Sequence, residues 1–118
     1  MTPHIRPALS SFAELVRGTY GDEVVGLVLF GSQARGEATE DSDIDVGVIL
    51  KTITDRRMVR DRIAELAYDV LLESGEDIQA VAITQDQWEF PETSSNPSLI
   101  QAMKQDGVTI DDAWSGTT

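Results

Sequence analysis

The sequence has 118 residues, and its 9 basic against 21 acidic side chains give a net charge of −12 at neutral pH. This charge argues against broad binding to nucleic-acid phosphates and to anionic membranes, because both surfaces are negative themselves. The absence of cysteine excludes disulfides and thiolate chemistry, and it fits a reducing cytoplasm. No apolar run approaches the roughly 20 residues of a membrane span, so we expect one cytoplasmic globular domain over residues 1–118.

The first half of the chain predicts a helix followed by two strands. Apolar residues spaced by three or four over 5–16 form a helical stripe that we expect to end near Gly18 or Gly21. The short β-branched run over 24–30 is typical of a buried central strand. After a polar stretch, residues 44–50 predict a second strand in which apolar and acidic positions alternate between its two faces.

The second half adds further helices and strands. The expected elements are a helix from Thr54 to just before Gly75, a strand over 77–83, a short helix over 85–90, a loop over 91–97, a helix capped by Ser98 that extends through Met103 and is closed by Gly107, and an edge strand over 108–110. We expect residues 111–118 to form a frayed tail. The alternation predicts an α/β (α+β) fold, in which helices pack on a small mixed β-sheet, but it leaves the order of the strands open.

The residues that carry chemistry lie between the first two strands, over 31–45. Gly31 follows a buried strand, where a glycine lets the backbone approach a ligand closely. Ser32 can open a helix whose free N–H groups attract phosphate. Asp43 and Asp45 are two residues apart at the start of a strand, so their carboxylates face the same side. Such a pair can converge on one or two hard cations.

Each of these features also has a purely structural explanation. A Gly-Ser pair after a strand is commonly just a turn, and two aspartates at a strand end are commonly solvated. The loop is neither a Walker A motif nor a dinucleotide fingerprint, because no lysine follows Gly36 and the middle glycine is missing. Taken together the features favour a site, since crowding two carboxylates is costly unless a cation compensates them.

The spacing of these residues resembles a known signature. Gly31-Ser32, ten further residues and Asp43-Ile44-Asp45 resemble the motif of the DNA polymerase β-like nucleotidyltransferase superfamily, and Ala34-Arg35-Gly36 with Ser42-Asp43 resembles the version in minimal nucleotidyltransferases. The resemblance implies a nucleotidyltransferase-like fold and nucleotidyl transfer, in which a hydroxyl attacks the α-phosphorus of a nucleotide and pyrophosphate leaves. It also implies roles for the matching residues: nucleotide binding by Gly31, Ser32, Arg35 and Ser42, and catalysis and Mg²⁺ binding by Asp43 and Asp45.

One position departs from the family pattern. Active members of the family carry a third carboxylate on the next strand, where our alignment places Gln79. A glutamine is neutral and cannot act as a base. Asp77 lies two residues earlier on the same strand face, so it can substitute as a catalytic residue if the strand register shifts.

The family resemblance also implies partners. Minimal nucleotidyltransferases often pair with HEPN-domain toxins, so we expect ATP or another nucleoside triphosphate as substrate, adenylylation of a toxin tyrosine, and a hetero-oligomer without direct nucleic-acid contact. The short chain suggests that part of the acceptor site belongs to the partner. The alternative is a non-catalytic antitoxin or regulatory nucleotide-binding subunit that acts by direct contact, which Gln79 supports. An aminoglycoside-modifying transferase shares the motif, but the chain length argues against it.

Four of the seven arginines gather at the start of the helix predicted from Thr54: Arg56, Arg57, Arg60 and Arg62. They form either a patch for a partner or for substrate phosphates, or a solvated face paired with neighbouring acids, and we favour the solvated face. Trp88 and Phe90 can stack on a base, anchor a partner or cover the core, and we favour the core.

Overall fold

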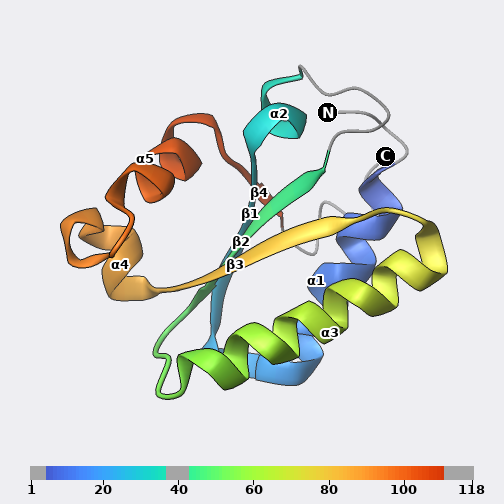
Figure 1. The fold of residues 1–118 in the computed structure, drawn as a ribbon, viewed down its shortest axis with the longest axis horizontal. Coiled ribbons are helices and arrows are strands. Elements are labelled where there is room, and N and C mark those ends of the chain that lie inside the picture. Colours follow the sequence, from blue (N-terminus) through green and yellow to red (C-terminus); the bar gives the residue numbers. More distant parts are fainter. Residues whose placement is uncertain (1–4, 37–42, 111–118) are drawn as a thin grey trace.

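The computed structural model describes residues 5–36 and 43–110 (Figure 1). The chain starts with α1 (Arg6–Tyr20), the 3₁₀ turn η2 (Gly21–Glu23), β1 (Val24–Phe30) and the short helix α2 (Gly31–Arg35). It continues with β2 (Ile44–Leu50), α3 (Arg56–Ser74) and β3 (Ile78–Thr84). The last elements are α4 (Gln85–Glu89), the 3₁₀ turn η3 (Pro91–Thr93), α5 (Pro97–Asp106) and β4 (Val108–Ile110).

The strands form a mixed sheet in the order β3-β2-β1-β4. β1 is antiparallel to both β2 and β4, whereas β2 and β3 are parallel. A parallel pair needs a long crossover, and α3 supplies it between β2 and β3. The expected small mixed sheet with packed helices is therefore confirmed, and β1 is a central strand as its apolar run predicted.

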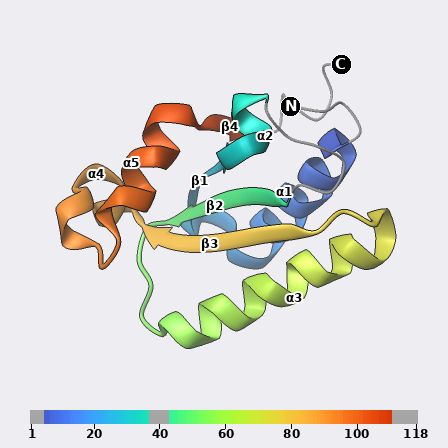
Figure 2. The same ribbon diagram turned by 45° about the horizontal axis from the view of Figure 1, so that its top comes forward.

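Helices cover both faces of this sheet (Figures 1 and 2). On one face, α1 and α3 pack against alternate residues of the strands, among them Leu27, Val46 and Ile78. On the other face, Ile100 and Met103 of α5 pack against residues of β1, β2 and β3. Among the described residues, no helix is both long and apolar enough to cross a membrane.

The alternation predicted for β2 is confirmed. Ile44, Val46 and Val48 are buried in the core beneath α1 and α3, so Asp45 and Gly47 belong to the opposite face. A Cβ on Gly47 would overlap the terminal methyl group of Met103, so α5 lies directly on that glycine. The α5 side of the sheet is thus filled at Gly47, and the acidic start of β2 lies before this contact.

Two helix starts differ from the sequence prediction. The N-cap of α3 is Asp55 rather than Thr54, and its carboxylate accepts a hydrogen bond of 3.1 Å from the backbone N–H of Met58. The N-cap of α5 is Asn96 rather than Ser98, so the helix begins inside the predicted loop, which also contains η3. Asp and Asn are strong N-cap residues, and in α5 the cap is followed by Pro97 at the first helical position, where proline is favoured.

The other boundaries differ less. α1 continues through Gly18 and ends before Gly21, whose φ is 56°. α5 extends to Asp106, and β3 begins and ends one residue later than predicted. The expected edge strand over 108–110 is confirmed as β4. The predicted frayed tail over 111–118 lies outside the described residues.

Candidate active site

The candidate site is built around Asp45, the second residue of β2. In the sheet Asp45 lies between Phe30, the last residue of β1, and Gln79 of β3. Its side chain is half-buried on the α5 face of the sheet. Asp45 is therefore held by a strand on each side, at the point where β1 ends and α2 begins.

Gly31 is packed against this carboxylate. A Cβ built on Gly31 would overlap the Oδ2 atom of Asp45, so the close approach requires a residue without a side chain. The φ of Gly31 is 73°, in the left-handed region that favours glycine. The loop glycine and the strand carboxylate, which sequence analysis singled out separately, are thus in direct contact.

Among the described residues, two carboxylates lie at the start of β2, those of Asp43 and Asp45. Asp43 is exposed and directly precedes β2, where strand alternation gives it the same face as Asp45. In residues 5–36 and 43–110, no group of three or more His, Cys, Asp or Glu side chains is arranged to hold a metal ion. Asp77 therefore does not complete a cluster with Asp43 and Asp45. Two carboxylates fit one Mg²⁺, which usually takes its other ligands from phosphates and water.

Gln79 lies directly beside Asp45 in the parallel pair. Its Nε2 donates a hydrogen bond of 3.0 Å to the Oδ1 atom of Asp77, and both side chains are exposed. The register is set by Ile44 and Ile78, which are partners and are both buried in the core. A slip that would place Asp77 beside Asp45 would be two residues long and would pair Ile44 with Glu76 instead of Ile78, whereas the observed register pairs the two isoleucines, so Gln79 holds the position next to Asp45.

The phosphate-binding segment predicted after β1 forms a single short helix. Ser32 and Arg35 are residues of α2, and Ser42 is outside the described residues. Gln33 of α2 is 2% exposed although it is polar, and nothing in the sequence pattern singled it out. The backbone carbonyl oxygen of Gln33 accepts a hydrogen bond of 3.4 Å from the backbone N–H of Gly36, where the φ is 75°. The turn after α2 is therefore closed through its own backbone.

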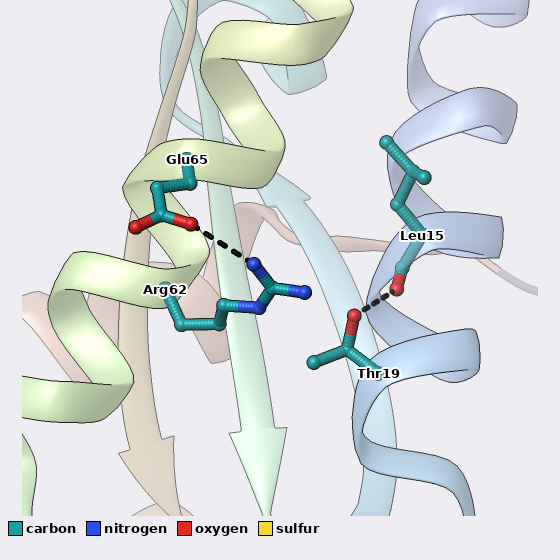
Figure 3. A network of polar contacts seen from close by, with 4 residues as sticks. All are labelled: Leu15, Thr19, Arg62 and Glu65. Carbon is teal, nitrogen blue, oxygen red and sulfur yellow. Dashed lines mark hydrogen bonds and ion pairs between the residues drawn. The ribbon is translucent and has the colours of Figure 1, made fainter.

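The arginine cluster lies at the exposed start of α3. Arg62 forms an ion pair of 2.9 Å with Glu65 on the same helix (Figure 3), and Arg60 lies 3.6 Å from Asp61. These are exposed pairs, which contribute little to stability. The favoured interpretation, a solvated face paired with acids, is confirmed for these two arginines.

The aromatic residues outside the site are structural in part. Trp88 packs against the core beneath α5, and the Nζ atom of Lys104 lies 5.2 Å from the centre of its ring, whereas Phe90 is exposed. Trp88 thus covers the core as expected, while Phe90 does not.

Burial raises the pKa of the Tyr20 hydroxyl, and the positive charge of Arg62 partly offsets this rise.

The fold, with a glycine turn facing a carboxylate on the next strand, is that of nucleotidyltransferases. A chain in the crystal structure of a toxin–antitoxin complex with AMP-PNP has the same fold, with a TM-score of 0.62, 20% sequence identity and coverage of 92% of this chain and 81% of that one. The family model of the nucleotidyltransferase domain matches residues 9–106. The chain belongs to this family, as the motif predicted.

Two further proteins are similar to this chain, one in sequence and one in fold. A chain of Methanocaldococcus jannaschii named "Putative protein adenylyltransferase MJ1305" is 38% identical over 65 residues, which is 55% of this chain and 42% of that protein. The chain thus matches less than half the length of this relative. The structure of a tri-AMPylated Shewanella oneidensis HEPN toxin in complex with its MNT antitoxin also contains the fold, with a TM-score of 0.57, 18% identity and coverage of 93% of this chain and 79% of that one.

Proposed function

We propose that this protein is a Mg²⁺-dependent nucleotidyltransferase that transfers AMP from ATP to a hydroxyl of a partner protein. The observation that carries this proposal is the contact between Gly31 and Asp45, at the end of β1 in a nucleotidyltransferase fold. The contact pairs a backbone suited to phosphate with a carboxylate suited to a cation. The relative named as a protein adenylyltransferase supports a protein as the acceptor.

The proposed roles follow from the chemistry of each group. Gly31, Ser32, Arg35 and Ser42 bind the triphosphate, and the backbone N–H groups of the turn face its negative charge. Asp43 and Asp45 would hold Mg²⁺, which when bound supplies positive charge to the phosphates and to the leaving pyrophosphate. Holding the α-phosphorus in place beside the incoming hydroxyl is the main contribution of the protein.

Proton removal from the acceptor is the step for which Gln79 is unsuited, because a neutral amide is not a base. Asp77 directly precedes β3, where strand alternation gives it the same face as Gln79 and Asp45, and its Oδ1 accepts a hydrogen bond of 3.0 Å from Gln79. We assign it the role of proton acceptor. This hydrogen bond fixes the Asp77 carboxylate while leaving its other oxygen available.

We further propose that the partner is a HEPN-type toxin, that this protein is its cytoplasmic antitoxin, and that the two form a hetero-oligomer. The support is the recurrence of toxin–antitoxin complexes, one with a HEPN toxin and an MNT antitoxin, among the structures with this fold. Residues 1–118 would form one minimal nucleotidyltransferase domain, and the acceptor would reach it from the partner.

A second function is favoured by one observation. The position beside Asp45 is occupied by Gln79, and the described residues provide no cluster of three carboxylates. A non-catalytic antitoxin, which binds nucleotide and neutralises its toxin by contact, would have this arrangement. Both functions predict nucleotide binding, so only transfer separates them.

The test is transfer of label from ATP labelled in the α-phosphate, with Mg²⁺ and an extract of the native host. The Asp45→Asn variant should lower transfer about a hundredfold or more, since it removes a charge at the reacting phosphates. Asp22→Asn, an exposed aspartate of η2 outside the site, is the matched control and should leave transfer unchanged. Full transfer by Asp45→Asn would refute the site, and toxin neutralisation without any transfer would favour the contact antitoxin.

A further inference from the structure

The outer edge of β3 offers hydrogen-bonding groups of the backbone. β3 is at one end of the sheet, and among the described strands only β2 pairs with it. The carbonyl oxygen of Asp77 faces β2, because it accepts a hydrogen bond of 3.2 Å from Ile44. In a parallel pair the backbone groups of alternate residues point to opposite sides, so those of Ile78, Ala80 and Ala82 point outward. Arg56 reaches the Ala82 carbonyl oxygen from this outer side, at 3.4 Å.

A groove follows this edge between β3 and α3, which run side by side (Figures 1 and 2). It consists of two hollows of about 260 and 290 Å³ that share Arg60 and Ala80 in their walls. The consecutive residues 77–82 of the chain all line it, so the groove runs along the strand edge rather than over one face of the sheet. Its opposite wall is α3, where small residues such as Ala64 and Ala67 leave room.

The chemistry of the groove favours an extended polypeptide. β3 has the sequence IQAVAIT, without the proline or charged residues that usually protect a strand edge from pairing. An added strand would use the outward N–H and C=O groups of Ala80, as in other cases of strand addition. The hollow beside residues 80–82 has Arg56 and Arg60 in its wall and no carboxylate, whereas Asp77 lines the other hollow. Arg60 also lies 3.6 Å from the exposed Asp61. In a protein of net charge −12, this end of the groove therefore favours acidic residues on its occupant.

The groove also leads to the candidate active site. Asp77 and Gln79 line it, and Gln79 is the neighbour of Asp45 in the sheet. A strand added to β3 would lie about 4.8 Å beyond it, and its residue beside Gln79 would face the same side as Asp45. Long aromatic side chains reach diagonal neighbours across strands, so a tyrosine there can extend over Gln79 toward the bound nucleotide.

We propose that an acidic, extended segment of the acceptor protein binds in this groove as an added strand on β3 and thereby presents its tyrosine hydroxyl to the site. This inference rests on the proposed function, since it names how the acceptor of that reaction is held. In the transfer step, the hydroxyl oxygen bonds to the α-phosphorus of ATP, the bond to the β-phosphate oxygen breaks, pyrophosphate leaves, and Asp77 receives the proton.

The first test is amide hydrogen exchange of the full chain, with a random copolymer of glutamate and tyrosine as the probe. The Ala80 amide should exchange about tenfold more slowly when the copolymer binds, because it gains a hydrogen-bond acceptor. The Val81 amide faces β2 and should change little. Unchanged exchange of Ala80 at saturating copolymer would overturn the proposal. Slowing that follows protein concentration without copolymer would also overturn it, since the edge would then pair with a second copy of the chain.

The second test uses charge reversal in the wall of the groove. Arg60→Glu should weaken transfer to the copolymer about tenfold, whereas Arg57→Glu, an exposed change on the same helix outside the groove, should leave it within about twofold. Ala80→Pro should lower transfer similarly, because it removes the outward N–H that an added strand would use. The variant should still fold, since edge strands tolerate proline. Equal transfer by Arg60→Glu and Arg57→Glu would overturn the docking proposal.

ATP binding, measured by calorimetry without any acceptor, separates the two proposals. If all variants bind ATP and transfer AMP to the copolymer equally well, the docking proposal is wrong and the proposed function stands. If the native protein binds ATP but transfers nothing to any acceptor, the enzymatic function itself is wrong.

Discussion

Replacing Gln79 by glutamate tests whether the missing carboxylate limits the site. The change places a negative charge beside Asp45 and removes the donor that Gln79 directs to Asp77. Neighbouring strands lie about 4.8 Å apart, and two charges about 5 Å apart repel by about 1 kcal/mol in water and about 3 kcal/mol near a protein surface. Because the position is exposed, we use the lower value. Adding about 1 kcal/mol for the lost hydrogen bond gives a destabilisation of about 2 kcal/mol without metal.

The assay is thermal unfolding in EDTA and in Mg²⁺. A loss of about 2 kcal/mol lowers Tm by about 8 °C in a chain of this size. Mg²⁺ should restore most of this loss in Gln79→Glu, because a cation beside the carboxylates reverses the sign of the electrostatic energy. Transfer of AMP should also rise about tenfold or more, since a positioned carboxylate can act as a base.

Two controls separate charge from position. Gln101→Glu adds the same charge on the exposed side of α5 and should give no Mg²⁺-dependent stabilisation beyond that of the native protein. Gln79→Met removes the hydrogen bond without adding a charge, so it should lose only about 1 kcal/mol. The reasoning is refuted if Mg²⁺ stabilises Gln79→Glu no more than Gln101→Glu.

Three further changes test the fold around the site. Gly31→Ala should lower the free energy of unfolding by about 1–2 kcal/mol from its positive φ alone, and it should abolish ATP binding in calorimetry. Gly18→Ala in α1, where a Cβ has open space, should raise the free energy of unfolding by about 0.5–1 kcal/mol. Equal melting temperatures of the two variants would contradict this reasoning. Asn96→Ala should cost about 1 kcal/mol in urea unfolding and Ser98→Ala almost nothing, and the reverse order would restore Ser98 as the cap. Because burial raises the pKa of Tyr20 in the folded state, its contribution to the free energy of unfolding should be fully present below pH about 10 and be lost as the pH rises through that raised pKa. Tyr20→Phe should remove this loss of stability at alkaline pH. An unchanged dependence of stability on pH would refute the assignment.

Local sequence patterns predicted most of the secondary structure. The β-branched run over 24–30 and the alternating run over 44–50 became strands with the predicted bounds, because burial and period are encoded within a few residues. Helix starts were less accurate, since Asp55 and Asn96 compete with neighbouring Thr and Ser as caps. Which of two nearby polar residues caps a helix depends on the local backbone conformation, which the pattern does not specify.

The sequence by itself determined the parts of the candidate site: a glycine after a buried strand and a pair of aspartates with one residue between them. The spacing of these residues also indicated the nucleotidyltransferase family. Only the tertiary structure brought Gly31 against Asp45, placed Gln79 beside it and left the outer side of β3 unpaired by any described strand. These relations depend on the order and register of strands that are distant in the chain. Register is selected by which side chains of neighbouring strands meet in the core, as Ile44 and Ile78 do on the face covered by α1 and α3, and no local pattern contains that information.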